Sequence, residues 1–278
     1  VEEADGYDAS NSDGNLDAIT YDVWVSPTGS DDASTTGIQS DPFKTINYDN
    51  IQSLITEIVN IINENNNQII NFDEIIYMYD KTWKDRWHDN VYLIDRTKKV
   101  NQYYNLGIEC LRNFYKKNIQ DNNSFLNNVV DCELEVEFSM EGVQFRGFID
   151  RLDFNSETNQ YTVNDYKTSK RIISSKKAKR DLQLGLYMIA VHEKFDILEP
   201  VNLKWHFLRY GVDIFVTPDM DDIASIKKTL VKKAKNIIEL SKENENFYAN
   251  ETILCNWCHY WEECSVKTIA NPAKRILK

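Results

Sequence analysis

Apolar residues recur every three or four positions in two stretches near the middle of the chain, which places them on one face of a helix. In residues 48–64 these positions are Ile51, Leu54, Ile55, Ile58, Ile61 and Ile62, and in residues 100–117 they are Tyr103, Tyr104, Leu106, Ile108, Leu111 and Phe114. Helices are also expected over residues 72–83, 179–194 and 220–241. The sequence therefore predicts several amphipathic helices on both sides of a central region.

That central region begins with residues 129–140, where polar and apolar positions alternate as in a half-buried strand. One face carries Glu133, Glu135 and Glu137, and the other carries Cys132, Leu134, Val136 and Phe138. Further strands are expected over residues 143–154, 160–167, 203–210 and 212–216. The order is helices, three strands, a helix, two strands and a helix, which predicts an α/β fold.

The negative charge of the chain is concentrated at its N-terminal end. The net charge is −12, and residues 1–45 hold ten acidic side chains against one basic side chain, Lys44. This shift in composition predicts a poorly ordered acidic tail over residues 1–46 and a folded domain over residues 47–278. The acidity of the whole chain therefore does not argue against nucleic-acid binding by the domain.

Within this tail, residues 21–46 read YDVWVSPTGSDDASTTGIQSDPFKTI. This segment resembles the opening of adhesin-like surface proteins with a right-handed β-helix. A β-helix buries its apolar face only by stacking several coils, and a single coil is present. We therefore interpret the segment as a disordered leader or as a fragment joined to the domain.

No stretch approaches the roughly 18–20 apolar residues of a membrane helix. No signal peptide is visible, and the first residue is Val1, so we expect a processed, trimmed or partial chain. We expect it to be cytoplasmic and to have no membrane partner.

Acidic residues occur at matching places on two neighbouring predicted strands. Asp150 lies in a hydrophobic run, and Asp165 and Lys167 are two residues apart on the next strand, so their side chains point to one face. Glu135 on the preceding strand is a candidate third acid, although Glu133 and Glu137 share its face. Clustered carboxylates repel each other unless a cation lies between them, and such oxygen ligands suit Mg²⁺ or Mn²⁺. The alternative is a set of solvated strand acids.

Four separated motifs resemble the PD-(D/E)xK nucleases, specifically their RecB-like branch, which includes CRISPR-adaptation exonucleases. They are GFIDRLD at 147–153, YTVNDYKTS at 161–169, QLGLY at 183–187 and the cysteine-rich end, and the resemblance covers residues 50–266. The resemblance implies a restriction-endonuclease-like core, in which helices flank a mixed central sheet.

The same resemblance implies roles for individual residues. Asp150, Asp165 and Glu135 would bind Mg²⁺ or Mn²⁺ together with the backbone carbonyl of Tyr166. Lys167 would be the catalytic lysine. Gln183 and Tyr187, four residues apart and so on one helix face, would act near the DNA end; ordinary helix packing is the alternative for this pair.

Cys255, Cys258 and Cys264 form a C-x₂-C-x₅-C motif after the last predicted helix. In the RecB-like nucleases this motif supplies three ligands of a [4Fe–4S] cluster, and a fourth cysteine precedes the first core helix. Here no cysteine occurs before residue 50. Three alternatives follow: a cluster with another ligand, a zinc site to which His259 contributes, or three cysteines left from a lost cluster.

The chain departs from the family a second time in the first core helix, where the family carries a metal-binding histidine. Gln52 stands at the expected place, and His88 comes too late in the chain to match. Both departures fall where the acidic tail meets the domain. We interpret them as the result of replacement of the original N-terminal segment.

Seven cationic residues run from the end of the strand that carries Asp165 to the Gln183 helix, and they predict a path for DNA phosphates toward the metal. They are Lys167, Lys170, Arg171, Lys176, Lys177, Lys179 and Arg180. A solvated loop is the alternative.

Taken together, the motifs predict a metal-dependent deoxyribonuclease that acts on single strands or DNA ends in DNA repair, recombination or defence. A decayed DNA-binding module without turnover is the first alternative, and an adhesin-like fragment is the weaker one. No P-loop motif is present, so any ATP-driven unwinding would need a helicase subunit as partner.

Overall fold

The computed structural model describes residues 49–64, 69–87, 97–121, 128–242 and 264. Its helices are α3 (Asp49–Glu64), α4 (Phe72–Arg86), α5 (Val100–Tyr115), the π-helical turn η1 (Lys116–Gln120), α6 (Ser175–Ala178), α7 (Leu182–Phe195) and α8 (Met220–Ser241). Its strands are β1 (Val129–Met140), β2 (Val143–Asn155), β3 (Gln160–Lys167), β4 (Asn202–Phe207) and β5 (Val212–Val216).

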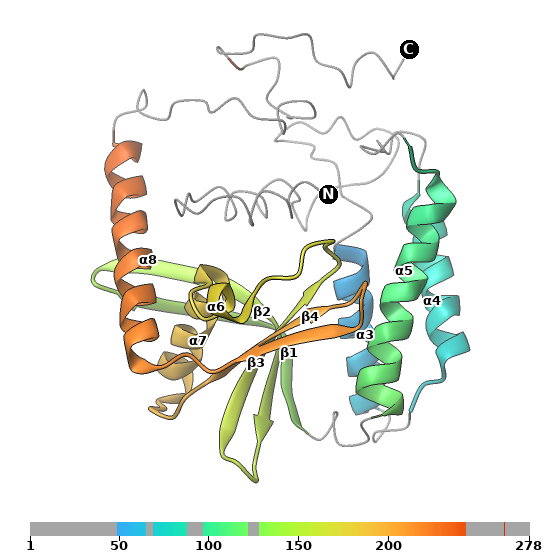
Figure 1. Cartoon of the computed structure of the whole chain (residues 1–278), viewed down its shortest axis with the longest axis horizontal. Helices are drawn as coiled ribbons and strands as arrows, with labels where there is room; N and C mark the ends of the chain where they lie inside the picture. The colour runs from blue at the N-terminus through green and yellow to red at the C-terminus, as the bar shows by residue number, and fades with distance from the viewer. Residues whose placement is uncertain (1–48, 65–68, 88–96, 122–127, 243–263, 265–278) are drawn as a thin grey trace.

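The five strands form one mixed sheet in the order β1-β2-β3-β4-β5. β3 and β4 are parallel, and the other neighbouring strands are antiparallel. Figure 1 shows α3, α4 and α5 at one side of the sheet and α7 and α8 at the other. The predicted α/β architecture, a mixed sheet flanked by helices, is therefore confirmed.

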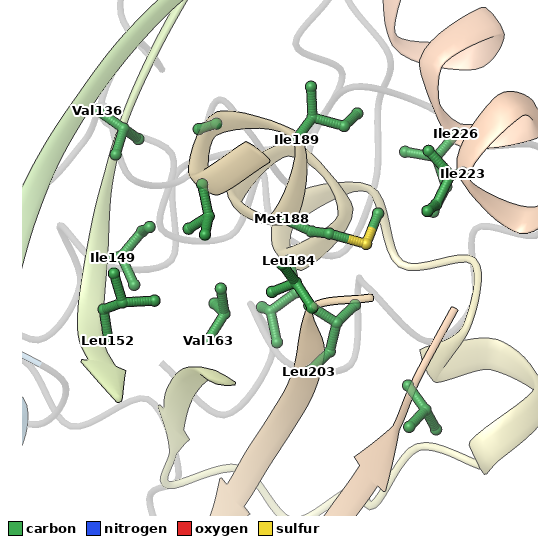
Figure 2. Packing of buried hydrophobic residues seen from close by; sticks show 14 of the residues in the cluster. Val136, Ile149, Leu152, Val163, Leu184, Met188, Ile189, Leu203, Ile223 and Ile226 are labelled. Carbon is green, nitrogen blue, oxygen red and sulfur yellow. The ribbon is translucent and has the colours of Figure 1, made fainter. Parts of the chain in front are cut away.

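The sheet separates two hydrophobic cores. The first core joins the inner face of the strands to α7 and α8, and Figure 2 shows Val163 and Leu203 beneath Leu184 and Met188 of α7. The second core joins α3, α4 and α5 to the sheet through residues such as Ile58, and it includes Tyr166 of β3. Val163 belongs to the first core, so β3 residues on opposite faces of the sheet anchor in opposite cores.

Three predicted boundaries were wrong by three residues, and local hydrogen bonding explains two of them. The helix expected to end at residue 83 continues to Arg86. The helix expected from residue 179 begins at Leu182 instead, because the Asp181 side chain accepts a hydrogen bond from the backbone N–H of Leu184 and caps the helix. The strand expected to reach residue 210 ends at Phe207, where a turn begins that closes with a hydrogen bond from Tyr210 N to Phe207 O of 3.0 Å.

Several predictions fall on residues outside the described ranges. They include the acidic tail with its adhesin-like segment, His88, His259, Cys255 and Cys258. Within the described ranges, no helix has the length and apolar character needed to cross a membrane.

Candidate active site

The register of the central strands brings the predicted acids together. β2 and β3 are antiparallel, with Arg151 opposite Asn164, so the next position along each strand sets Asp150 across from Asp165. On β3, Lys167 Nζ lies 3.3 Å from Asp165 Oδ2. The charges of Asp150, Asp165 and Lys167 all act on the hydroxyl of Tyr187. The sequence therefore places one ammonium and two carboxylates in one small region.

Helix α7 adds one amide group, from Gln183, and one hydroxyl group, from Tyr187, to this region. Lys167 Nζ donates to Gln183 Oε1 at 3.3 Å, and Gln183 Nε2 donates to the Tyr187 hydroxyl at 3.4 Å. Burial raises the pKa of Tyr187, so its hydroxyl stays protonated at neutral pH. A continuous chain of contacts thus runs from Asp165 through Lys167 and Gln183 to Tyr187.

The Tyr187 ring lies against Gly147 of β2, and this close approach requires glycine. A Cβ atom at residue 147 would lie 2.7 Å from Tyr187 Cε1, well inside van der Waals contact. Gly147, the first residue of the GFIDRLD motif, therefore leaves space for the ring of Tyr187.

Gly147→Ala should displace the Tyr187 ring and so loosen the Gln183–Lys167 contact. We expect a loss of about 1–3 kcal/mol in the free energy of unfolding, as for other overpacked sites, and roughly a tenfold or greater loss of the DNA cleavage that the sequence motifs predict. Denaturant unfolding and single-turnover cleavage rates would measure the two effects.

Gly142→Ala is the matched control, because Gly142 has a φ of +79° and no atom lies within 4 Å of a Cβ placed there. This variant should lose stability through backbone strain yet keep its turnover. Equal turnover in the two variants would contradict the role of Gly147.

Asp150 is held by Tyr166 and by Gln52 of α3. Tyr166 N donates to Asp150 Oδ2 at 2.8 Å, and Gln52 Nε2 donates both to Asp150 Oδ2 at 3.1 Å and to the Tyr166 carbonyl at 3.0 Å. Burial nevertheless raises the pKa of Asp150 to about 6, against the opposing effect of the Tyr166 N–H and of Lys167. This carboxylate therefore favours an added positive charge beside it.

Glu135, the predicted third acid, lies across from Phe148 and forms ion pairs with Arg146, and its side chain is 46% exposed. Glu133 instead falls opposite Asp150, between the pairs Cys132–Arg151 and Leu134–Ile149. The charge of Glu133 contributes to raising the pKa of Asp150. The structure therefore places Glu133, rather than Glu135, as the β1 acid nearer to Asp150.

The predicted cationic path follows the connection between β3 and α7. Lys170, Arg171, Lys176, Lys177 and Arg180 are exposed along it. Lys179 is half-buried, and its Nζ lies 3.8 Å from Asp219 and 3.7 Å from Asp222 at the start of α8. Lys179 is therefore directed toward α8, whereas the other five cations are exposed.

Only one residue of the cysteine motif is described, the half-buried Cys264. Burial raises the thiol pKa of both Cys110 and Cys132 to about 12, so these two remain neutral thiols. Over the described ranges, no three His, Cys, Asp or Glu side chains gather as a metal-holding group. The Fe–S or zinc site stays a prediction.

Comparison with known proteins decides the family. A model of the PD-(D/E)XK nuclease superfamily matches residues 62–265. The chain belongs to this superfamily. The match contains β2, β3 and α7 with Asp150, Asp165, Lys167 and Gln183, so the superfamily prediction is confirmed.

Two solved structures resemble this PD-(D/E)XK chain. An Eubacterium rectale protein named as a candidate exonuclease is 11% identical, with 79% of this chain and 78% of that one covered and a TM-score of 0.40. The protein SSO0001 is 17% identical, with 70% and 97% covered and a TM-score of 0.33. None of the curated proteins matches the sequence.

Proposed function

We propose that the chain is a metal-dependent deoxyribonuclease of the RecB-like type that degrades single strands or DNA ends. The observation that supports this most directly is the meeting of Asp150, Asp165 and Lys167 on neighbouring strands of a PD-(D/E)XK domain. Phosphodiester hydrolysis by this superfamily fits two acids and an ammonium held within one small region.

The residues present fit a hard divalent cation. Mg²⁺ is commonly held by one or two carboxylates and keeps several waters, so three full acidic ligands are not required. Asp150, Asp165 and the Tyr166 carbonyl would hold the ion, and Gln52 would join them by turning its amide to present Oε1. The raised pKa of Asp150 supports this, because a nearby cation would favour its ionised form. When bound, the ion would polarise the phosphodiester and lower the pKa of water.

The side chains around these acids would position the substrate. The Lys167 ammonium, fixed between Asp165 and Gln183, would orient the attacking water or stabilise charge on the phosphate. The five exposed cations after β3 would draw the DNA backbone toward the acids. A role in repair, recombination or defence and a helicase partner belong to the same proposal.

A decayed DNA-binding module is the second candidate, and Gln52 is the observation that favours it. Its amide nitrogen, which is a donor, bridges the two oxygens that a cation would need. A chain that kept this arrangement would bind DNA through the exposed cations without cleaving it.

The full chain, purified without oxygen, tests the two candidates. It would be incubated with end-labelled single-stranded and blunt double-stranded DNA in Mn²⁺, Mg²⁺ or EDTA. We expect degradation in Mn²⁺ or Mg²⁺ and none in EDTA. DNA binding without turnover in both metals would reject the nuclease and favour the decayed module.

A further inference from the structure

A buried arginine lies directly behind the proposed ion site. Arg151 and Tyr166 follow Asp150 and Asp165 in the chain, and each is only 1% exposed. The Arg151 guanidinium donates to the Tyr166 hydroxyl through Nη1. It also donates to both carboxylate oxygens of Asp153, at 2.8 Å and 3.0 Å. Arg151 therefore clamps β2 to β3 at the position next to both acids.

The surrounding groups leave this guanidinium one orientation. Arg151 Nη2 donates to Asn164 Oδ1 at 3.0 Å, and Asn164 Nδ2 donates to Asp153 Oδ2 at 3.0 Å and to the Thr162 carbonyl at 3.1 Å. Reversing the Asn164 amide would set donors against donors and acceptors against acceptors. Because the guanidinium is a rigid planar fork, its fixed partners also fix where Nη1 points.

Tyr166 links this network to the ion site. Its hydroxyl accepts from Arg151, its backbone N–H donates to Asp150 Oδ2, and its carbonyl accepts from Gln52. Its ring is held by Phe114 of α5 and His206 of β4, at centroid distances of 5.8 Å and 5.0 Å. A movement of the ring would therefore move the peptide groups that contact Asp150.

We propose that Arg151 is a positioning residue of the nuclease: through the Tyr166 hydroxyl it sets the orientation of the Tyr166 carbonyl and of the Asp150 carboxylate at the ion site. This inference rests on the proposed function. Because Arg151 is buried, it would act through Tyr166 and not through contact with DNA. Groups that orient metal ligands from behind commonly change metal affinity or activity by about 10–100-fold when they are lost.

Tyr166→Phe tests this inference, because it removes only the hydroxyl that Arg151 contacts. Mn²⁺ affinity would be measured without DNA from the electron paramagnetic resonance of free Mn²⁺, well below the thermal midpoint. We expect about tenfold weaker Mn²⁺ binding and a similar fall in kcat at saturating Mn²⁺, with the KM for DNA unchanged within about twofold. A purely structural role would lower the thermal midpoint but leave the Mn²⁺ affinity of the folded protein unchanged.

Tyr161→Phe is the matched control. Tyr161 lies on the same strand, and its ring packs against Phe154 and Phe195. It should keep wild-type Mn²⁺ affinity and kcat. Arg151→Lys is the second variant, since an ammonium retains the charge but cannot reproduce the fork; it should weaken Mn²⁺ binding at least as much as Tyr166→Phe.

The outcomes separate this inference from the proposed function. Wild-type Mn²⁺ affinity and kcat in both Tyr166→Phe and Arg151→Lys would overturn the role of Arg151 and leave the nuclease in place. A wild-type chain that binds no Mn²⁺ and cleaves no DNA would overturn both. A wild-type chain that binds Mn²⁺ without cleaving would reject the nuclease, and the affinities would still decide whether Arg151 positions the ion.

Discussion

Asp165→Ala and Lys167→Ala should each abolish Mn²⁺-dependent degradation of single-stranded DNA, with a loss of at least about a thousandfold in the single-turnover rate. The uncatalysed reaction is among the slowest in biology, so nearly all of the observed rate depends on the groups that stabilise its transition state. The Asp165→Ala variant would lack a carboxylate of the proposed ion site. The Lys167→Ala variant would lack the ammonium that lies 3.3 Å from that carboxylate. End-labelled DNA resolved on denaturing gels measures both rates.

Lys235→Ala is the matched control for the lysine variant. Lys235 is an exposed residue of α8 that pairs with Glu141 at 2.8 Å, so its loss should leave the rate unchanged. Wild-type rates in purified, folded Asp165→Ala and Lys167→Ala would refute the assignment of the site.

Asp150→Asn should have opposite effects on activity and stability. It removes a proposed ligand and should inactivate the enzyme, yet it should raise the free energy of unfolding at pH 8 in EDTA by at most about 3 kcal/mol. The reason is that burial raises the pKa of Asp150 to about 6, so the folded protein holds an unfavourable charge at high pH. Thermal midpoints of the variant and the wild type would measure the gain.

The pH dependence of this gain has a definite sign. Because the folded state binds the Asp150 proton more tightly than the unfolded state does, wild-type stability falls as pH rises from about 4 to about 6. The advantage of Asp150→Asn should therefore be full at pH 8 and should vanish near pH 4. Added Mn²⁺ should raise the wild-type midpoint and have much less effect on the variant.

Asp80→Asn provides the comparison for this second prediction. Asp80 is a half-buried partner of Lys84, whose hydrogen bond lowers the pKa of Asp80, so the substitution should bring no stability gain at pH 8. Equal midpoints for wild type and Asp150→Asn at pH 8 would show that the Asp150 charge is not destabilising.

Most of the fold could be predicted because each element has a clear periodicity. The alternating apolar residues of β1 and the apolar residues of α3 at spacings of three and four are the ones that become buried, since each element packs one face against a core. The errors at Leu182 and Phe207 arose where a cap or a turn ends an element, and hydrophobic spacing contains little information about either.

The site was predicted less completely, for two physical reasons. Glu133 and Glu135 share a face in a regular strand, so alternation could not rank them, whereas the pairing register places Glu133 opposite Asp150. Sequence reasoning did not identify Arg151 as part of the site, because an arginine is rarely buried and its partners, Tyr166 and Asn164, lie on another strand. Contacts between strands are set by register, which one sequence does not reveal.

The two faces of β3 contact different parts of the molecule, and this has a consequence for the proposed nuclease. Lys167 meets Gln183 on the α7 side, while Tyr166 packs among the helices on the other side. The proposed catalytic site is therefore assembled only when the helices on both faces of the sheet are folded against it. A nascent or partly unfolded chain would lack this site.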